Sequence, residues 1–456
     1  MAENEAAVEE IELDDARVEA IRAAVAAGDR ALVLGLVEPL HAADIADFLE
    51  QIDAGERRGF LALYSGEIDG DLLSEIDETI REEVIAALPA EVVAEAVRDL
   101  DTDDVVDILE DLEAPAQGRI LDALDKADRV AVEQAMAYPE GSAGRLMQRE
   151  VVVAPEHWTV GEAIDFLRGE DGLPDQFYHV ILVDPRMKPL GYVTLGRILS
   201  ARREVALKAL TEDSFRTVEA TEEESEVAYI FNQYHLISCP VVDAGGRLVG
   251  VITIDDAMNV LDEEHEEDML RLAGVGEEAS VLDGPLATVR QRLPWLVVNL
   301  FTASISAVVI SRFEATITAI VALAALMPIV ASTGGIAGTQ SLAVAVRALA
   351  TRDLTAANAR RVVLRELAAG ALNGLALAVI LGVAGGLIFA DPWIGGVLAM
   401  AMVVNQIVAA LGGVLVPLTL ERMGLDPALA SGTFVTTLTD VMGFLAFLGL
   451  ATLVLI

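Results

Sequence analysis

From Arg290 to the C-terminus the chain consists largely of five long apolar stretches. Each has about the 20 residues that a helix needs to cross the apolar core of a bilayer. This region carries only 9 basic and 7 acidic residues, and it has no lysine or histidine. We therefore predict an all-α membrane domain over residues 290–456, with five transmembrane helices. Their expected bounds are about 293–310, 315–346, 367–390, 393–420 and 428–456.

The preceding part of the chain has the opposite character. It contains 22 basic and 66 acidic residues, a net charge of −44, and the whole chain of 456 residues carries −42. Such acidity argues against a nucleic-acid partner, because phosphate contacts need Lys and Arg. A single cysteine, Cys239, excludes a disulfide scaffold and a cysteine-based zinc site. Because the opening residues are acidic, we do not expect them to act as a signal peptide. We expect a multidomain membrane protein whose partner is the lipid bilayer.

The first part of the chain, residues 1–136, contains a repeat of twelve residues. Segments between the repeated positions have the apolar periodicity of short amphipathic helices with acidic outer faces. We predict an α-solenoid N domain, in which each short helix buries its apolar face against its neighbours. The alternative is an acidic helical bundle that binds no ligand. The repeated positions are all apolar: Leu40, Ile52, Tyr64, Ile76, Leu88, Leu100, Leu112 and Leu124.

Residues 137–258 contain a duplication. The pattern at residues 183–194 recurs at 242–253, an offset of 59, and each copy alternates predicted helices with β-rich runs. The region resembles an α/β tandem CBS pair, with copies at about 137–203 and 204–258. Such pairs can bind adenine nucleotides such as ATP near a T-x-x-D motif. The second copy keeps Thr253 and Asp256, so any nucleotide site is expected there, whereas residues 194–197 of the first copy end in arginine.

The segment 259–289 is predicted to link the CBS pair to the membrane domain as an acidic helix. Eight of the fourteen residues 255–268 are acidic. On a helix Glu264 would face Asp268, and each like-charge pair one turn apart costs a few tenths of a kcal/mol. Either the helix is simply solvated, or divalent cations relieve the repulsion.

The connecting loops set the orientation. The loop between the second and third stretches holds five arginines, and the next loop holds only Asp391. Positive loops stay on the cytoplasmic side. We therefore expect a multi-pass protein of the cytoplasmic membrane, with a cytoplasmic N-terminal half and an external C-terminus.

Asp440 is the only ionisable residue deep inside an apolar stretch. A carboxylate at such depth is costly in lipid and marks an ion or proton path. Two copies of Asp440 facing across a homodimer axis would suit a hydrated Mg²⁺, which is held through few carboxylates. A proton relay, or a structural Asp bonded to nearby hydroxyls, is the alternative.

Other polar or small residues are candidates to line such a pore. The run 327–341 is rich in glycine and interrupts the second stretch, and glycines at membrane depth allow close helix approach or unwound backbone around a cavity. The pore-lining candidates are Thr436, Thr437, Asn405, Gly334 and Gly335.

Catalytic motifs are not found. Residues 99–110 match an EF-hand at four ligand positions, but Asp104 replaces the required glycine and the segment continues a helical pattern. No HExxH motif or GxxxxGK[ST] phosphate loop occurs. We therefore predict that the chain is not an enzyme.

Taken together, these parts resemble the MgtE family of magnesium transporters over essentially the whole length. The segments STGGIAGTQS, RALATRDL and LDPALASGTFVTTLTDVMG carry the resemblance. It implies a homodimeric Mg²⁺ channel whose cytoplasmic domains bind Mg²⁺ and draw the linking "plug" helices together to close the pore. It also implies that Asp440 holds hydrated Mg²⁺ and that Asp426 faces the plug helix. The implied regulatory Mg²⁺ ligands are Asp71, Asp103, Asp107, Asp256, Glu264, Glu267, Asp268 and Asp426.

Three departures from the family pattern, Asn259, His235 and Ile336, are expected to affect only minor regulatory sites. Two other functions stay open. One is a CBS-gated carrier that prefers Mn²⁺ or Co²⁺ or is coupled to protons. In the other, the acidic half reflects a high-salt proteome and has no sensing role.

Overall fold

The computed structural model describes residues 13–456 except positions 171, 175, 213, 277, 278, 282, 283 and 430. The chain divides into two compact units, residues 1–264 and 265–456, which are described separately. The acidic opening residues 1–12, and positions 277, 278, 282 and 283 of the predicted linking segment, lie outside the described residues.

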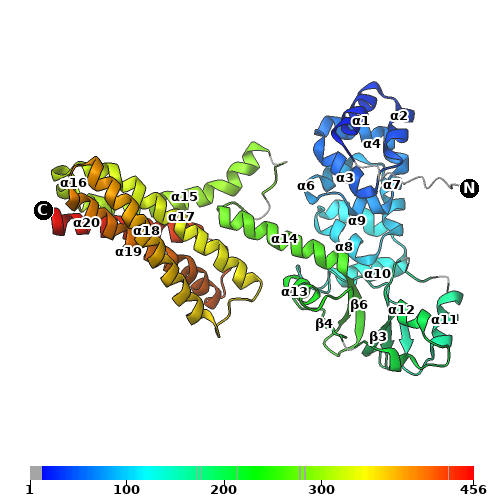
Figure 1. Ribbon diagram of the computed structural model, residues 1–456. Coiled ribbons are helices and arrows are strands. Elements are labelled where there is room, and N and C mark those ends of the chain that lie inside the picture. The colour runs from blue at the N-terminus through cyan, green and yellow to red at the C-terminus, as the bar shows by residue number, and fades with distance from the viewer. Residues whose placement is uncertain are drawn as a thin grey trace, which may run out of the picture. The chain divides into compact units, whose positions relative to one another are not determined.

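The N-terminal part of the first unit is a stack of short helices (Figure 1). The α-solenoid prediction is confirmed. The helices are α1 Asp15–Ala27, α2 Arg30–Val37, α3 Ala42–Gln51, α4 Ala54–Tyr64, α5 Gly70–Ser74, α6 Glu78–Ala87, α7 Ala90–Ala96, α8 Thr102–Glu110, α9 Ala114–Ala123 and α10 Lys126–Ala135, with 3-10 turns at η1 Ser65–Glu67 and η2 Val97–Asp99.

The twelve-residue repeat has a simple structural basis. A helix of about ten residues is followed by one apolar residue and then by the residue that caps the next helix. Ile52 ends α3, and the carboxylate of Asp53 then accepts hydrogen bonds from Gly55 N at 2.7 Å and Glu56 N at 2.9 Å. Such caps satisfy the free N–H groups of a helix start. The eight repeated apolar residues all join one continuous core.

The duplicated region forms two small sheets of identical topology. In each, the first strand is parallel and the third antiparallel to the central strand. The CBS-pair prediction is confirmed. The strands are β1 Val153–Pro155, β2 His179–Val183 and β3 Pro189–Thr194, then β4 Val218–Glu219, β5 Ser238–Val242 and β6 Leu248–Thr253; the accompanying helices are α11 Val160–Gly169, α12 Leu195–Ser200, η3 Leu207–Leu210, α13 Glu224–Tyr234 and α14 Ile254–Ala273.

The two copies meet through equivalent positions. His179 and Ser238 are 59 residues apart, the offset of the duplication, and His179 Nδ1 lies 2.5 Å from Ser238 Oγ. Both side chains are buried. Burial lowers the pKa of His179 to about 4, so the imidazole is neutral near pH 7. The copies are thus related by an approximate two-fold axis that passes between these two side chains.

The predicted linking helix differs from the observed one. Helix α14 begins directly after β6 at Ile254 and ends at Ala273, and the next helix begins only at Pro285. Gly274 has a left-handed φ of 72°, which suits glycine and ends the helix. Among the described residues of this segment, the acidic helix therefore covers Ile254–Ala273 and not the predicted 259–289.

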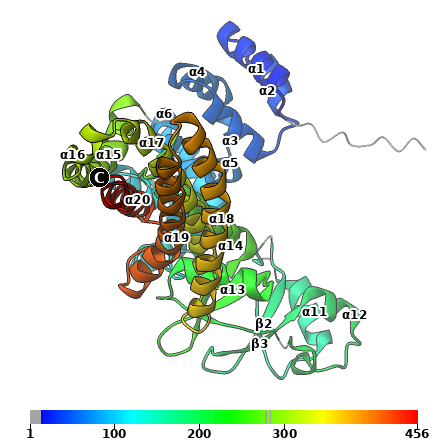
Figure 2. The ribbon, with the colours of Figure 1, turned by 60° about the vertical axis from the view of Figure 1, so that its left-hand side comes forward.

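The second unit consists mainly of long apolar helices. Five helices in the described part of the chain are long and apolar enough to span a membrane, as predicted. Figure 2 shows them as a bundle in which α18 and α19 run side by side. The helices are α15 Pro285–Ser311, α16 Glu314–Ala319, α17 Ala322–Ala350, α18 Ala359–Ile388, α19 Pro392–Arg422 and α20 Ser431–Leu455, of which α16 is short.

The observed bounds correct two details of the predicted spans. The second stretch was expected to be interrupted near residues 328–338, but α17 is helical throughout that run, and the break lies earlier, between α16 and α17. The glycines there permit close approach of neighbouring helices instead of unwinding the backbone. The third helix starts at Ala359, eight residues before the predicted 367, because three of the five arginines of the predicted loop belong to its first turns.

Candidate functional site

Asp440 lies in the N-terminal half of α20, and its side chain is half-buried. The hydroxyls of Thr436 and Thr437 each donate a hydrogen bond of 2.7 Å to a carbonyl one turn earlier in the same helix. Thr439 likewise donates to a carbonyl, at 2.8 Å. These hydroxyls therefore do not hold the carboxylate, and the alternative of a structural Asp bonded to them is wrong for this structure.

Asn405 and Gly334 lie inside the helix bundle of the single chain. The Asn405 side chain is fully buried, and its Nδ2 donates to Val330 O on α17 at 2.8 Å. A Cβ on Gly334 would lie 2.2 Å from that Nδ2, so only glycine leaves room for the amide. This differs from the prediction that both residues line a pore. Gly335, by contrast, is partly exposed and has only Thr436 nearby.

Acidic side chains converge where the solenoid meets the second CBS copy. Asp103, in the first turn of α8, shares a hydrogen bond with Asp256, in the first turn of α14. Burial, reinforced by the charge of Asp256, raises the pKa of Asp103 well above its usual range and that of Asp104 to about 7. Burial also raises the pKa of Asp256 to about 6. The fold thus holds these carboxyl groups close together, although they repel one another when they are ionised.

This cluster, Asp103, Asp104 and Asp256, differs in part from the predicted ligand set. Asp104 was missed, although its place beside Asp103 at a helix start was a usable signal. Asp107 is largely exposed and lies 2.9 Å from the buried Arg81. Asp71, on α5, is exposed. Among the described residues, no three His, Cys, Asp or Glu side chains form a ready-made metal cage.

The T-x-x-D motif has a local structural role. Thr253 Oγ1 donates to Asp256 Oδ2 at 2.6 Å, which caps the start of α14. The carboxylate predicted for a nucleotide therefore already has Thr253 and Asp103 as partners. The nearby cavity between the CBS copies, lined in part by Tyr178 and Ser238, has a volume of only about 20 Å³.

A second charged cluster lies at the end of α14, within the second unit. Arg271 Nη1 is 2.7 Å from Asp426 Oδ2, and Arg271 Nη2 is 2.8 Å from Glu267 Oε2. Burial and the nearby charge of Asp426 raise the pKa of Asp268. The expected contact between Asp426 and the plug helix is thus present, through Arg271, a residue that the sequence analysis missed. It is the only Lys or Arg in α14, which was a usable signal.

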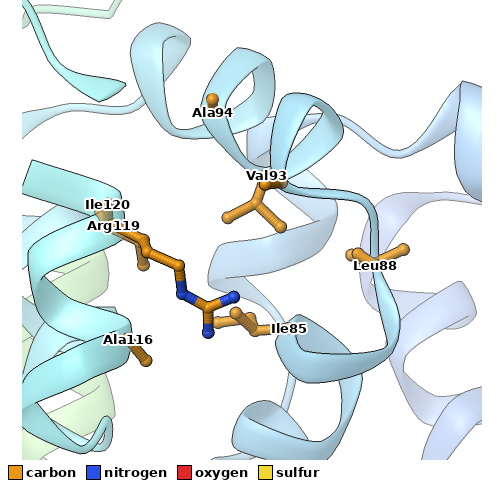
Figure 3. A pocket seen from close by; sticks show the side chains of 8 residues that line it. Ile85, Leu88, Val93, Ala94, Ala116, Arg119 and Ile120 are labelled. Atoms are coloured by element: carbon orange, nitrogen blue, oxygen red, sulfur yellow. The ribbon is translucent and has the colours of Figure 1, made fainter. Parts of the chain in front are cut away.

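Glu264 lies one turn before Asp268 on α14 and is partly exposed. Another cavity, of about 40 Å³, lies among α6, α7 and α9 (Figure 3). Its lining is apolar apart from Arg119, so it suits neither a cation nor a polar ligand.

Comparison with known proteins follows the same division of the chain. Residues 327–450 match the family model of the MgtE divalent cation transporter, residues 40–141 the MgtE intracellular N domain, and residues 143–204 and 207–263 the CBS domain.

The whole chain is similar to two magnesium transporters named MgtE. It is 34% identical to that of Thermus thermophilus over 95% of this chain and 98% of the relative, and 27% identical to that of Bacillus subtilis over 91% and 92%. Among solved structures, the cytosolic domain of the Mg²⁺ channel MgtE in complex with ATP is 28% identical, with a TM-score of 0.49, over 53% of this chain and 99% of that one. The chain belongs to the MgtE family of magnesium transporters.

Proposed function

We propose that the protein conducts Mg²⁺ across the cytoplasmic membrane as a homodimer, and that Mg²⁺ bound by its acidic cytoplasmic domains closes the pore. The convergence of Asp103, Asp104 and Asp256 carries this proposal. Three carboxyls in a partly dehydrated interface repel one another when ionised, and a divalent cation relieves that repulsion. Because such a cation binds the compact arrangement best, it shifts the population toward that arrangement.

Asp440 supports the transport half of the proposal. In the described part of the chain its carboxylate has no protein partner, and it lies on a helix whose hydroxyls bond internally. A carboxylate without such a partner can accept hydrogen bonds from the water molecules bound to a cation. Mg²⁺ keeps most of its bound water, so two such carboxylates across a dimer axis would hold it loosely enough to pass. Thr436, Thr437 and Gly335, on partly exposed faces, would line the path.

The Asp426 cluster supports a link between the sensor and the pore. Glu267, Asp268 and Arg271 of α14 lie against the loop that precedes α20, and α20 carries Asp440. In this proposal, a movement of α14 reaches α20 through that loop. In this proposal the soluble half lies in the cytoplasm and the C-terminus outside, and the arginine-rich loop supports that orientation. An ATP molecule at the T-x-x-D motif of the CBS pair would have to compete with Thr253 and Asp103 for the carboxylate of Asp256.

Mg²⁺ flux into liposomes that contain the full chain tests this function. We expect uptake of Mg²⁺ that needs no pH gradient and that falls when Mg²⁺ on the side of the soluble domains reaches millimolar levels. Parallel assays with Mn²⁺, Co²⁺ and Ca²⁺ measure selectivity. Uptake that requires a pH gradient would establish the proton-coupled alternative, and a preference for Mn²⁺ or Co²⁺ would establish the other carrier.

Protease protection of the soluble half separates sensing from generic acidity. If the acidic domains respond to Mg²⁺, millimolar Mg²⁺ protects them and an equal ionic strength of NaCl does not. Equal protection by both salts would show that the acidity has no sensing role.

A further inference from the structure

Two buried arginines occupy equivalent positions in the solenoid. Arg57 follows the cap residue Asp53 by four positions, and Arg81 follows Asp77 by four, so they lie two twelve-residue repeats apart. Both side chains are almost completely buried, at 6% and 7% exposure. The repeat thus uses one arrangement twice.

Each guanidinium makes the same two kinds of contact. Arg57 Nε donates to Leu49 O at 2.9 Å, and Arg81 Nε donates to Ile76 O at 3.0 Å, near the end of the preceding helix. Each also reaches an acid 26 positions further along the chain. Arg57 pairs with Glu83 at 2.5 Å and Arg81 with Asp107 at 2.9 Å.

Of these two arginines, Arg81 alone pairs with the helix that carries the acidic cluster, where Arg145 also pairs with Glu110 at the far end. Asp103, Asp107 and Asp111 are spaced by four residues, so they lie on one face of α8 and its cap, about 6 Å apart along the axis. Arg81 pairs with both Asp107 and Asp111. Asp103 instead meets Asp256. This row of three acids therefore has a protein cation at one end and carboxyls without one at the other.

We propose that Arg81 is a tethered competitor of Mg²⁺, which holds Asp107 and thereby lowers the affinity of the sensor for the ion. This inference rests on the proposed function, because it assumes that Mg²⁺ binds beside Asp103. Asp107 is 62% exposed, so an ion from solvent can reach the carboxylate that Arg81 approaches from the buried side. A cation that recruits Asp107 must displace the guanidinium or share the carboxylate with it.

The competition has a functional consequence. A sensor of this kind must stay unoccupied when Mg²⁺ is scarce, so an affinity that is too high would hold the pore closed. A fixed guanidinium reduces the negative potential along α8 at every Mg²⁺ concentration. Removal of Arg81 should therefore strengthen Mg²⁺ binding even though it weakens the fold.

The test compares Arg81→Met with Arg57→Met in the full chain in detergent. Methionine keeps much of the apolar length and removes the charge. The readout is the Mg²⁺ concentration that gives half-maximal protease protection. We expect Arg81→Met to lower this midpoint about two- to fivefold, the range of an exposed ion pair. Arg57→Met loses the equivalent carbonyl contacts and should leave the midpoint unchanged.

A double variant identifies the acid involved. In an Asp107→Asn background, Arg81→Met should no longer lower the midpoint. An unchanged or raised midpoint in the single Arg81→Met variant overturns the inference. If Arg81→Met does not fold, Arg81→Lys replaces it; lysine keeps one charge but lacks the fork that binds two carboxylates, and it should lower the midpoint by a smaller factor. No lowering with Lys then overturns the inference.

The wild-type protein distinguishes a failure of the proposed sensing function from a failure of the proposed role of Arg81. If it shows no Mg²⁺-dependent protection, the proposed sensing function is wrong. If it shows protection with a midpoint that Arg81→Met and Arg81→Lys do not lower, only the role of Arg81 is wrong.

Discussion

The carboxylates of the two units are arranged in opposite ways. In the first unit, acids crowd together, and Asp103, Asp104 and Asp256 share a partly buried interface that raises their pKa values. In the second unit, Asp440 is the only acid deep within a membrane-spanning helix, and no described group bonds to it. The first arrangement suits a cation that binds and stays, and the second suits one that passes.

The difference shows that the arrangement of the carboxylates, more than their number, determines what each one can do. Crowded carboxyls store repulsion that a bound ion releases, so binding is coupled to a change of shape. A lone carboxylate has no such repulsion to release, so it can attract a hydrated ion without a large conformational change. The predictions below test this contrast.

Replacement of the lone carboxylate should have the largest effect. We expect Asp440→Ala to keep the fold and to reduce Mg²⁺ flux, or its preference over Ca²⁺ and Na⁺, by about tenfold or more, since the only deep charge is lost. Liposome flux assays measure both quantities, and the elution profile in detergent checks the fold. Unchanged Mg²⁺ flux together with unchanged selectivity in the variant would remove Asp440 from the pore.

Neutralisation of the crowded acids should free the channel from Mg²⁺ control. We expect the triple variant Asp103→Asn, Asp107→Asn and Asp256→Asn to conduct at Mg²⁺ concentrations that silence the wild type. Its closing midpoint should rise about tenfold, because the ligands through which Mg²⁺ favours the compact arrangement are lost. Flux measured against Mg²⁺ on the cytoplasmic face gives this midpoint.

Three exposed acids elsewhere in the same unit provide a charge-matched control. Asp122, Glu133 and Asp165 each pair with an arginine outside the cluster. Their joint neutralisation should leave the closing midpoint near that of the wild type. If both triple variants shift the midpoint equally, net charge and not the cluster controls the gate.

Packing in the membrane unit should be sensitive to substitution of Gly334, one of several glycines at close helix contacts. We expect Gly334→Ala to destabilise the bundle by about 1–3 kcal/mol, because the new methyl group would collide with the Asn405 amide. Gly335→Ala meets only Thr436 Cγ2, at 3.8 Å, and should be neutral or slightly stabilising. Thermal unfolding in detergent compares the two, and equal melting temperatures would contradict this close contact.

A change of pH should act on the crowded acids in a graded way. Asp104 and Asp256 have pKa values of about 7 and 6 in the compact arrangement, above the usual value of about 4. The compact arrangement thus binds more protons, so its stability rises as the pH falls through 7 and 6 and levels off below about 4.

In Mg²⁺-free buffer, a fall from pH 7.5 to 5.5 should therefore increase protease protection of the soluble half. The Mg²⁺ midpoint should rise about two- to fivefold over the same range, because protons compete for the carboxylates. The variant Asp104→Asn should show a weaker response. Protection that decreases on acidification would contradict the predicted sign.

The fold was largely predictable because its signals are local and periodic. The apolar stretches, the twelve-residue repeat and the offset of 59 each follow from a regular structure that repeats along the chain. The helix at residues 102–110 likewise agreed with the rejection of an EF-hand. The interruption predicted in α17 was wrong because its glycines serve contacts with other helices, which local sequence does not specify.

The candidate sites were only partly predictable, for a related reason. The sequence identified the acids but could not show which of them the fold brings together. Asp104 faces the CBS acids, whereas Asp107 faces Arg81, a residue 26 positions earlier. Arg271 was missed because its partner Asp426 lies far along the chain. Partners that are distant in sequence depend on tertiary packing.

The pairing of His179 with Ser238 has a consequence for how this domain arose. When one gene product forms a symmetric dimer, the residue on the axis must contact its own copy, so the two side chains are identical by necessity. Two imidazoles or two hydroxyls would meet there. Once the halves are joined in one chain, each side of the axis can mutate alone. The neutral imidazole beside a hydroxyl is an unlike pair that a symmetric ancestor was unable to form.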